Sequence, residues 1–348
     1  MAGCPLDCAY CIRKYGNFAM KTPRLLMTDE QAVQALVGHR WFTPHMTPLQ
    51  LFNRATDPML PQVKPHTLAT ARLLDARGLT NHLLIITRWR VTAEDCAALN
   101  ELRSLKVTVL VTHSNIADAR VEPVDSGIAA RSLRTAYEWA GRYRVVLYWR
   151  PIVPGLNDAD ADLARAVELS GSAHATVFTG LFFREQIRAY YQAVGLPEPY
   201  PGVARRKILP AELERRVVDY FDAHAPATAL FRKTSCAVSY VHGLADYNGH
   251  YGIRELCDIC PVEQVRRCAA GFRRPDPARV ADLAARVGAA VPRPVVTDQA
   301  VVTSGADEQR RYWLQHQLGF QVHDTEHPHH PRRHGRAATG WPDTEPPL

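Results

Sequence analysis

The sequence predicts an α/β fold built on a parallel sheet. Helical and strand patterns alternate regularly between residues 28 and 183, as they do in chains whose parallel strands are joined by helices. The strand patterns are short apolar runs, which are typical of strands buried on both faces. The 348 residues, 46% hydrophobic and 22% charged, suit a soluble globular chain with room for one large domain and an appendage.

Local signals place the elements in order. The segment TDEQAVQALVGH begins with a capping box, Thr28 to Gln31, and carries apolar residues at helical spacing. A short strand follows at 48–53, then a helix over 65–77 that Gly78 closes, and a buried strand at 81–87. The series continues with a helix from Thr92, a strand at 107–113, a helix over 127–140, a strand at 144–149, a helix over 158–169 and a strand at 175–183.

After residue 183 the pattern changes. Helical segments rich in arginine and tyrosine are broken by the proline-rich stretch 195–202. Further on, the sequence predicts a helix over 276–288, a strand within 294–303 and a helix over 307–320. Residues 324–348 have almost no apolar content, which predicts disorder. We therefore expect a core over 1–195, linker helices and a cysteine-rich region over 196–275, an extension over 276–323 and a disordered tail.

The stretch GCPLDCAYC brings three thiols together in one short loop. Cys4, Cys8 and Cys11 have the spacing C-x3-C-x2-C, and thiolates are ligands for iron–sulfur clusters or zinc. A structural zinc or an electron-transfer cluster takes four protein ligands, whereas a cubane on three cysteines keeps one iron free. The alternative is a zinc site completed by His39 or His45.

This spacing, with Tyr10 before the last cysteine, resembles the signature of the radical S-adenosylmethionine (SAM) superfamily. The resemblance implies a [4Fe–4S] cluster whose free iron binds SAM, and an electron donor of the flavodoxin or ferredoxin type. It also implies a partial (β/α)6 barrel of the TIM type in which a strand precedes the cysteine loop. Only three residues precede Cys4, so that strand is missing and we expect the reading frame to start farther upstream.

Several polar residues follow predicted strands, where ligands gather in α/β folds. Thr56 and Asp57 stand where the family has a turn that contacts the SAM amino group, although an Asp-Pro turn is the plain alternative. Val153, Gly155 and Asp158 resemble the family's adenine-supporting element. Ser114, Asn115 and Arg150 are further candidates for SAM, Tyr10 belongs to the cysteine motif, and Arg184 and Glu185 are expected beside the substrate.

A second group of cysteines lies between residues 236 and 268. Its members are Cys236, Cys257, Cys260 and Cys268. Four soft ligands suit a closed site. The run C-x15-G-x4-C from Cys236 to Cys257 resembles the start of the auxiliary-cluster regions called SPASM and twitch domains, which implies an auxiliary [4Fe–4S] cluster; zinc is the alternative. The remaining cysteine, Cys96, is expected to be a small buried apolar residue in a helix.

We therefore predict a radical SAM enzyme that cleaves SAM reductively and abstracts hydrogen from a small molecule or peptide. A nucleic-acid-modifying enzyme of the photolyase-like branch is one alternative, favoured by the net charge of +7. A non-catalytic zinc or iron–sulfur protein is the other. No apolar run is long enough to cross a bilayer and no leader is visible. We therefore expect a cytoplasmic protein without a membrane partner.

Overall fold

The computed structural model describes residues 1–11, 20–52, 55–200, 203, 209–288 and 295–326. The chain forms two compact units, Met1–Thr228 and Ala229–Leu348. The predicted disordered tail is, apart from residues 324–326, outside the described residues, as is part of the proline-rich stretch.

The first unit contains a parallel sheet, as the sequence predicts. Its strands lie side by side in chain order and are parallel at each junction. They are β1 (Leu49–Gln50), β2 (His82–Thr87), β3 (Lys106–His113), β4 (Arg144–Ile152) and β5 (Ala175–Gly180). Among the described residues β1 pairs only with β2, so the sheet is open at this edge and no closed barrel forms.

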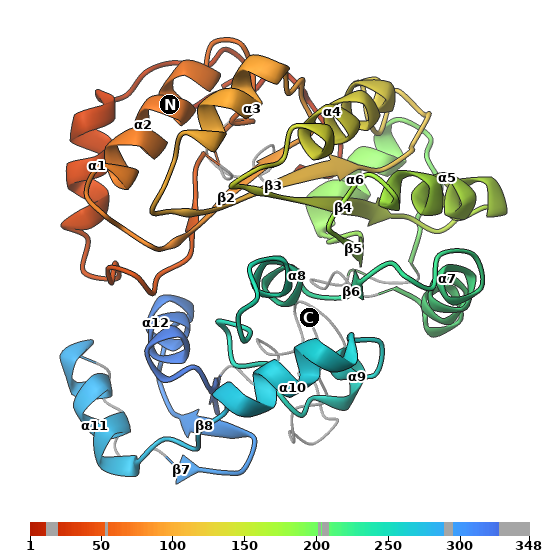
Figure 1. Ribbon diagram of the computed structural model, residues 1–348. Helices are drawn as coiled ribbons and strands as arrows, with labels where there is room; N and C mark the ends of the chain where they lie inside the picture. The colour runs from red at the N-terminus through yellow and green to blue at the C-terminus, as the bar shows by residue number, and fades with distance from the viewer. Residues whose placement is uncertain (12–19, 53–54, 201–202, 204–208, 289–294, 327–348) are drawn as a thin grey trace. The chain divides into compact units, whose positions relative to one another are not determined.

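Seven helices accompany this sheet in the described part of the first unit. They are α1 (Asp29–Val37), α2 (Lys64–Asp75), α3 (Ala93–Asn100), α4 (Ser126–Glu138), α5 (Asp160–Ser170), α6 (Glu185–Ala193) and α7 (Ala211–His224). Thr28 and Thr92 accept hydrogen bonds from the third backbone amide of α1 and α3, as N-caps do. Helices α2, α3 and α4 lie over one face of the sheet in Figure 1.

The strands of this sheet are nearly continuous apolar runs because both of their faces are buried. Leu83, Leu84 and Ile85 of β2 are fully buried, as are Val145 to Leu147 of β4. Such strands need cover on both faces, which the connecting helices of an α/β fold supply. The predicted strand 48–53 is shorter in the structure, because Phe52 takes a left-handed φ of 57° and turns the chain. The predicted strand 175–183 ends at Gly180.

The second unit is smaller and mostly helical. It begins with the two-residue strand β6 (Leu230–Phe231) and ends in a small three-stranded sheet in which β8 pairs antiparallel with β7 and parallel with β9. Its elements are α8 (Thr234–Val241), α9 (Arg254–Cys257), α10 (Val262–Gly271), α11 (Pro277–Arg286), β7 (Val295–Val296), β8 (Ala300–Thr303), α12 (Glu308–Leu318) and β9 (Gln321–Asp324). Val280, Leu314 and Phe320 are buried in its core. Strand β9 was not predicted.

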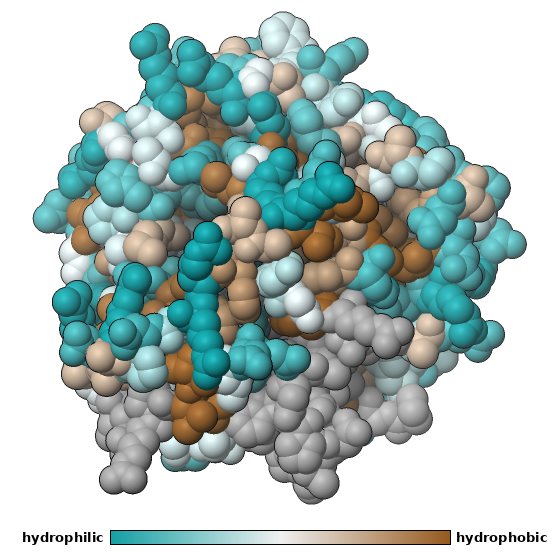
Figure 2. All heavy atoms as spheres, turned by 60° about the horizontal axis from the view of Figure 1, so that its bottom comes forward, coloured by the Kyte–Doolittle hydropathy of each residue, from teal (hydrophilic) through white to brown (hydrophobic). Residues whose placement is uncertain are grey.

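The described helices include none with the length and apolar content that a bilayer crossing requires. Figure 2 shows one face of the molecule, on which hydrophilic side chains predominate and apolar ones form separate patches.

His113, at the end of β3, gives the first unit a pH-dependent stability. The side chain is buried, and burial together with Arg165 lowers its pKa to about 4, while Glu122 and Glu168 oppose and Arg88 reinforces the shift. The unfolded chain, with a histidine pKa near 6.5, therefore binds a proton that the folded chain does not, and stability falls as pH drops below 6.5. Between pH 7.5 and 5, we expect the free energy of unfolding of the natural chain to fall by about 2 kcal/mol more than that of His113→Gln.

Urea unfolding at a series of pH values measures this difference, because the other histidines contribute equally to both proteins. An identical pH slope for the two proteins would contradict the assignment to His113.

Candidate metal and cofactor site

Backbone hydrogen bonds tie the loop of Cys4, Cys8 and Cys11 to three distant segments. The Gly3 amide donates to the Ala55 carbonyl at 3.1 Å, Cys4 to Met20 at 3.0 Å, and Ala9 to Val121 at 2.9 Å. Gly3 has a φ of 113°, and a Cβ there would lie 2.1 Å from the Thr22 carbonyl oxygen, so only glycine fits. The loop is thus held in one conformation at the same edge of the sheet as the turn after β1.

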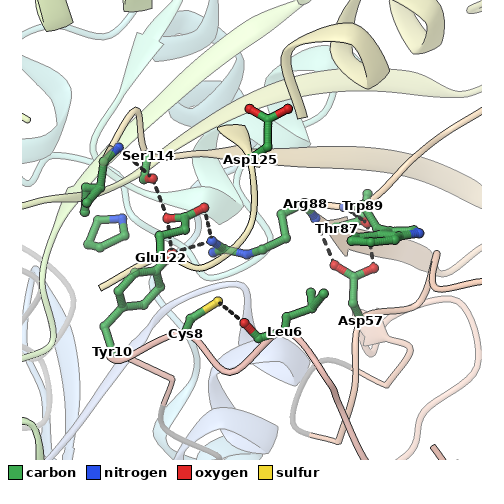
Figure 3. A network of polar contacts seen from close by, with 12 residues as sticks. Leu6, Cys8, Tyr10, Asp57, Thr87, Arg88, Trp89, Ser114, Glu122 and Asp125 are labelled. Carbon is green, nitrogen blue, oxygen red and sulfur yellow. Dashed lines mark hydrogen bonds and ion pairs between the residues drawn. The ribbon is translucent and has the colours of Figure 1, made fainter. Parts of the chain in front are cut away.

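The three cysteines of this loop belong to one side-chain cluster. Cys8 is buried and Cys4 and Cys11 are half-buried, and all three pack with Leu6 and Leu60 in one cluster. The Cys8 thiol donates to the Leu6 carbonyl at 3.7 Å (Figure 3). Burial raises the pKa of Cys8 to about 11; Arg88 opposes this, and Cys4 and Cys11 are close enough to add to it. The loop therefore brings the three thiols near one another, and their role as metal ligands stays a prediction.

A buried polar network lies beside Cys8 (Figure 3). Arg88, just after β2, donates from Nη1 to Glu122 Oε1 at 2.5 Å and also to the Tyr10 hydroxyl. Tyr10 donates to Glu122 Oε2 at 2.5 Å, and the Ser114 hydroxyl donates to the same oxygen. The side chains of Arg88 and Glu122 are only 11% and 3% exposed. Burial keeps the pKa of Tyr10 well above its usual value; Arg88 opposes this shift and Glu122 adds to it, so the hydroxyl stays a donor.

Asp57 and Thr56, on the turn after β1, have different surroundings. The Asp57 carboxylate accepts from the Thr87 hydroxyl at 2.6 Å and from the amides of Arg88 and Met59 at 2.9 Å each. Both of its oxygens are thus engaged in joining the turn to the end of β2. Thr56 is 6% exposed, and its hydroxyl oxygen has no hydrogen-bond partner among the described residues. Of the two residues, Thr56 is therefore the one whose side-chain oxygen has no hydrogen-bond partner among the described residues.

The other SAM candidates occupy the ends of β3 and β4. Asn115 has a φ of 62° and donates to Asp162 at 2.5 Å. Arg150 lies over the Tyr148 ring and donates to its hydroxyl at 3.0 Å. Val153 is fully buried, and the Gly155 amide donates to the Asp158 carboxylate at 2.9 Å.

The fully buried side chain of Asn157 joins these two strand ends. It donates to the Ser114 and Pro151 carbonyls and accepts from the Val153 amide. Sequence reasoning missed it.

Arg184 and Glu185 lie at the start of α6. Arg184 is the N-cap residue, with its guanidinium 6.0 Å from the Phe182 ring centroid. Glu185 is 68% exposed and pairs with Arg188 one turn later. Their predicted contact with substrate stays a prediction.

Glu122 is the central residue that sequence reasoning missed. It lies in the long connection after β3 and joins three residues that are far apart in the chain, Tyr10, Arg88 and Ser114. No motif marks it, because its partners are recognisable only after folding. Arg88 directly follows the predicted strand 81–87, but its pairing could not be predicted.

The histidines of the zinc alternative have other partners. The His39 ring accepts from the Trp41 amide, and the His45 ring contacts the Thr80 hydroxyl at 3.0 Å. Among the described residues, one set of three metal-binding side chains has its ligand atoms within 4.8 Å of one another, and it includes neither histidine nor the three cysteines of the loop. Sulfurs on one tetrahedral zinc would lie about 3.8 Å apart. The loop as folded therefore suits a larger group than a single zinc ion.

The second cysteine group gathers within the second unit. Cys236 lies on α8, Cys257 ends α9, Cys260 follows it and Cys268 lies on α10; each interacts electrostatically with the others. The Cys268 sulfur accepts from the Asp246 amide at 3.4 Å and from Gln264 at 3.3 Å. Burial raises the pKa of Cys260 to about 12 and holds that of Cys236 well above its usual value. Cys96 is fully buried in α3, as predicted.

Neither a protein-family model nor a curated protein matches the chain. Solved structures do resemble it. One is spore photoproduct lyase in complex with dinucleoside spore photoproduct, with 14% identity, a TM-score of 0.43, and coverage of 66% of this chain and 74% of that one. Another is Streptococcus suis SuiB bound to S-adenosylmethionine, with 10% identity, a TM-score of 0.41, and coverage of 73% of this chain and 54% of that one.

The second of these structures was solved with S-adenosylmethionine bound, the cofactor that the cysteine motif implies. Because both TM-scores are below 0.5, the proposals below rest on the chain's own residues.

Proposed function

We propose that this protein is a radical SAM enzyme that carries a [4Fe–4S] cluster on Cys4, Cys8 and Cys11. The observation that carries the proposal is the convergence of three thiols, and no fourth cysteine, on one loop at the strand-end edge of a parallel sheet. When bound, the cluster with SAM on its free iron supplies a 5'-deoxyadenosyl radical. The chain's own residues hold the cluster, orient SAM and exclude water.

The polar edge beside the loop suits the charged end of SAM. Thr56, with its buried unpartnered hydroxyl, is our first candidate for the SAM amino group. Asp57, Ser114 and Asn115 are already hydrogen-bonded within the protein. They therefore hold the backbone of the SAM site in place as much as they contact SAM. The buried Arg88–Glu122 pair lies behind Cys8 and fixes the loop through Tyr10.

A second iron–sulfur cluster is proposed on Cys236, Cys257, Cys260 and Cys268, with zinc as the alternative. The support is that four buried or half-buried thiols gather in the second unit and that the Cys268 sulfur accepts two hydrogen bonds, as cluster thiolates do. Among the described residues no three of these sulfurs lie within 4.8 Å of one another, which favours a cluster over one zinc ion.

The proposed substrate is a small molecule or peptide from which one hydrogen atom is abstracted, with Arg184 and Glu185 near it. A flavodoxin or ferredoxin would supply the electron. We place the protein in the cytoplasm, where its eight cysteines, none of which is in a disulfide, stay reduced. A nucleic acid is the second candidate substrate, and the net charge of +7 is what favours it. DNA or RNA binding that weakens steeply with salt would select the nucleic acid.

Anaerobic incubation of reconstituted protein with SAM and dithionite tests the proposal. We expect 5'-deoxyadenosine and methionine even without substrate, and about eight irons per chain if both clusters are present. A protein that carries four irons or fewer and forms no 5'-deoxyadenosine would be the non-catalytic metal protein instead.

A further inference from the structure

A carboxylate oxygen is buried without a hydrogen-bond partner beside the second cysteine group. The side chain of Asp246 is 1% exposed, and its Oδ1 has no donor among the described residues. Its Oδ2, in contrast, accepts from the Asn248 amide at 3.1 Å, the His250 amide at 3.0 Å and His250 Nδ1 at 2.9 Å. The Ser235 hydroxyl also interacts with this carboxylate. Burial of an ionised oxygen is costly unless a donor or a cation faces it.

The carboxylate of Asp246 lies beside the thiols of the second cysteine group. Ligand atoms of Cys236, Asp246 and His250 all lie within 4.8 Å of one another, and all three residues are buried. The Asp246 amide donates to the Cys268 sulfur at 3.4 Å, and the His250 carbonyl accepts from the Cys257 thiol at 3.6 Å. The short loop 246–250 thus lies next to three of the four cysteines, Cys236, Cys257 and Cys268.

The loop is held in place by the protein around it. Gly249 has a φ of 68°, and a Cβ on it would lie 2.5 Å from the Gly319 carbonyl oxygen, so the loop packs directly on the turn between α12 and β9. The Asn248 side chain bonds His316 at 2.9 Å, and its carbonyl accepts from Gln321 at 2.6 Å. Asp246 is therefore positioned by the fold before any metal binds.

We propose that Asp246 is a ligand of the metal centre in the second unit and that its Oδ1 binds the same metal ion as Cys236. The inference rests on the metal centre proposed above and extends it from four thiolates to a mixed sulfur and oxygen set. Both iron and zinc accept carboxylate oxygen. His250 is a positioning residue, because its Nδ1 holds the other carboxylate oxygen, as outer-shell partners of metal ligands do. The ion on Cys236 and Asp246 thereby differs from ions held by thiolates alone.

The test uses the full chain with Cys4, Cys8 and Cys11 all replaced by alanine, so that only the second centre remains. Into this chain we would introduce Asp246→Ala, Asp246→Asn and Asp246→Cys, and count iron, sulfide and zinc per folded chain. We expect Asp246→Ala and Asp246→Asn to hold about one metal ion fewer per chain, and Asp246→Cys to restore the count with an altered electron paramagnetic resonance spectrum. The matched control is Asp258→Asn, since Asp258 lies between two cysteines but pairs with Arg232.

The outcomes separate the two proposals. Folded Asp246→Ala or Asp246→Asn protein with the metal count and spectrum of its parent would overturn the ligand assignment. If Asp246→Ala does not fold, the nearly isosteric Asp246→Asn decides alone. Absence of metal from the folded parent would overturn both this inference and the second centre. SAM cleavage by the intact protein would still support the first.

Discussion

Cys8→Ala is expected to abolish 5'-deoxyadenosine formation and to lower the iron content by about four per chain. Cys8 is the buried member of the loop, and its neighbours Cys4 and Cys11 provide two ligands where a cubane with one free iron needs three. Anaerobic protein incubated with SAM and dithionite should form the nucleoside at least about 100-fold more slowly than the natural chain.

Cys96→Ala is the matched control, because it also removes a buried thiol, but from the interior of α3. We expect it to keep both the iron and the activity. If Cys8→Ala forms the nucleoside at the natural rate, the loop is not the site of SAM cleavage.

Arg88→Met is expected to lower the free energy of unfolding by about 3–5 kcal/mol, because it leaves Glu122 as an unpaired buried carboxylate. Glu122→Leu should also destabilise, since it removes the charge that Arg88 faces. When both partners are replaced, by methionine and leucine, much of the loss should be recovered, because no charge is then left buried without a partner. Urea unfolding of the four proteins, arranged as a double-mutant cycle, measures the coupling.

The exposed pair of Arg72 and Glu101 is the internal comparison. Its atoms are 3.5 Å apart and its side chains are 52% and 68% exposed. The same cycle there should give less than about 1 kcal/mol, because water screens the charges. Equal coupling energies at the two pairs would show that burial does not strengthen the Arg88–Glu122 interaction.

The buried pair also bears on the cysteine loop. Tyr10 lies between Cys8 and Cys11 in the sequence and hydrogen-bonds both charged partners. Loss of the pair therefore removes the polar anchor of the loop while the three thiols remain. The two predictions thus distinguish the ligands of the proposed cluster from the residues that hold the ligands in place.

Local signals in the sequence were sufficient for much of the fold. The capping residues Thr28 and Thr92 place the starts of α1 and α3, and apolar runs place β2 to β5, because each signal involves residues within one turn or one strand. The short β1 and the unpredicted β9 show the limit of such signals. Two-residue or four-residue strands form only because a neighbouring strand offers hydrogen bonds.

The sequence by itself determined the α/β class, the order of the elements and the two cysteine groups, because these depend on spacing along the chain. Only the tertiary structure decided the roles of Glu122 and Asp246. Glu122 meets Tyr10 across 112 residues. Asp246 belongs to no motif, but folding buries its carboxylate beside Cys236 and leaves one oxygen without a hydrogen-bond partner among the described residues. A charged side chain is ordinary on a surface and significant once buried, and burial is a property of the whole fold.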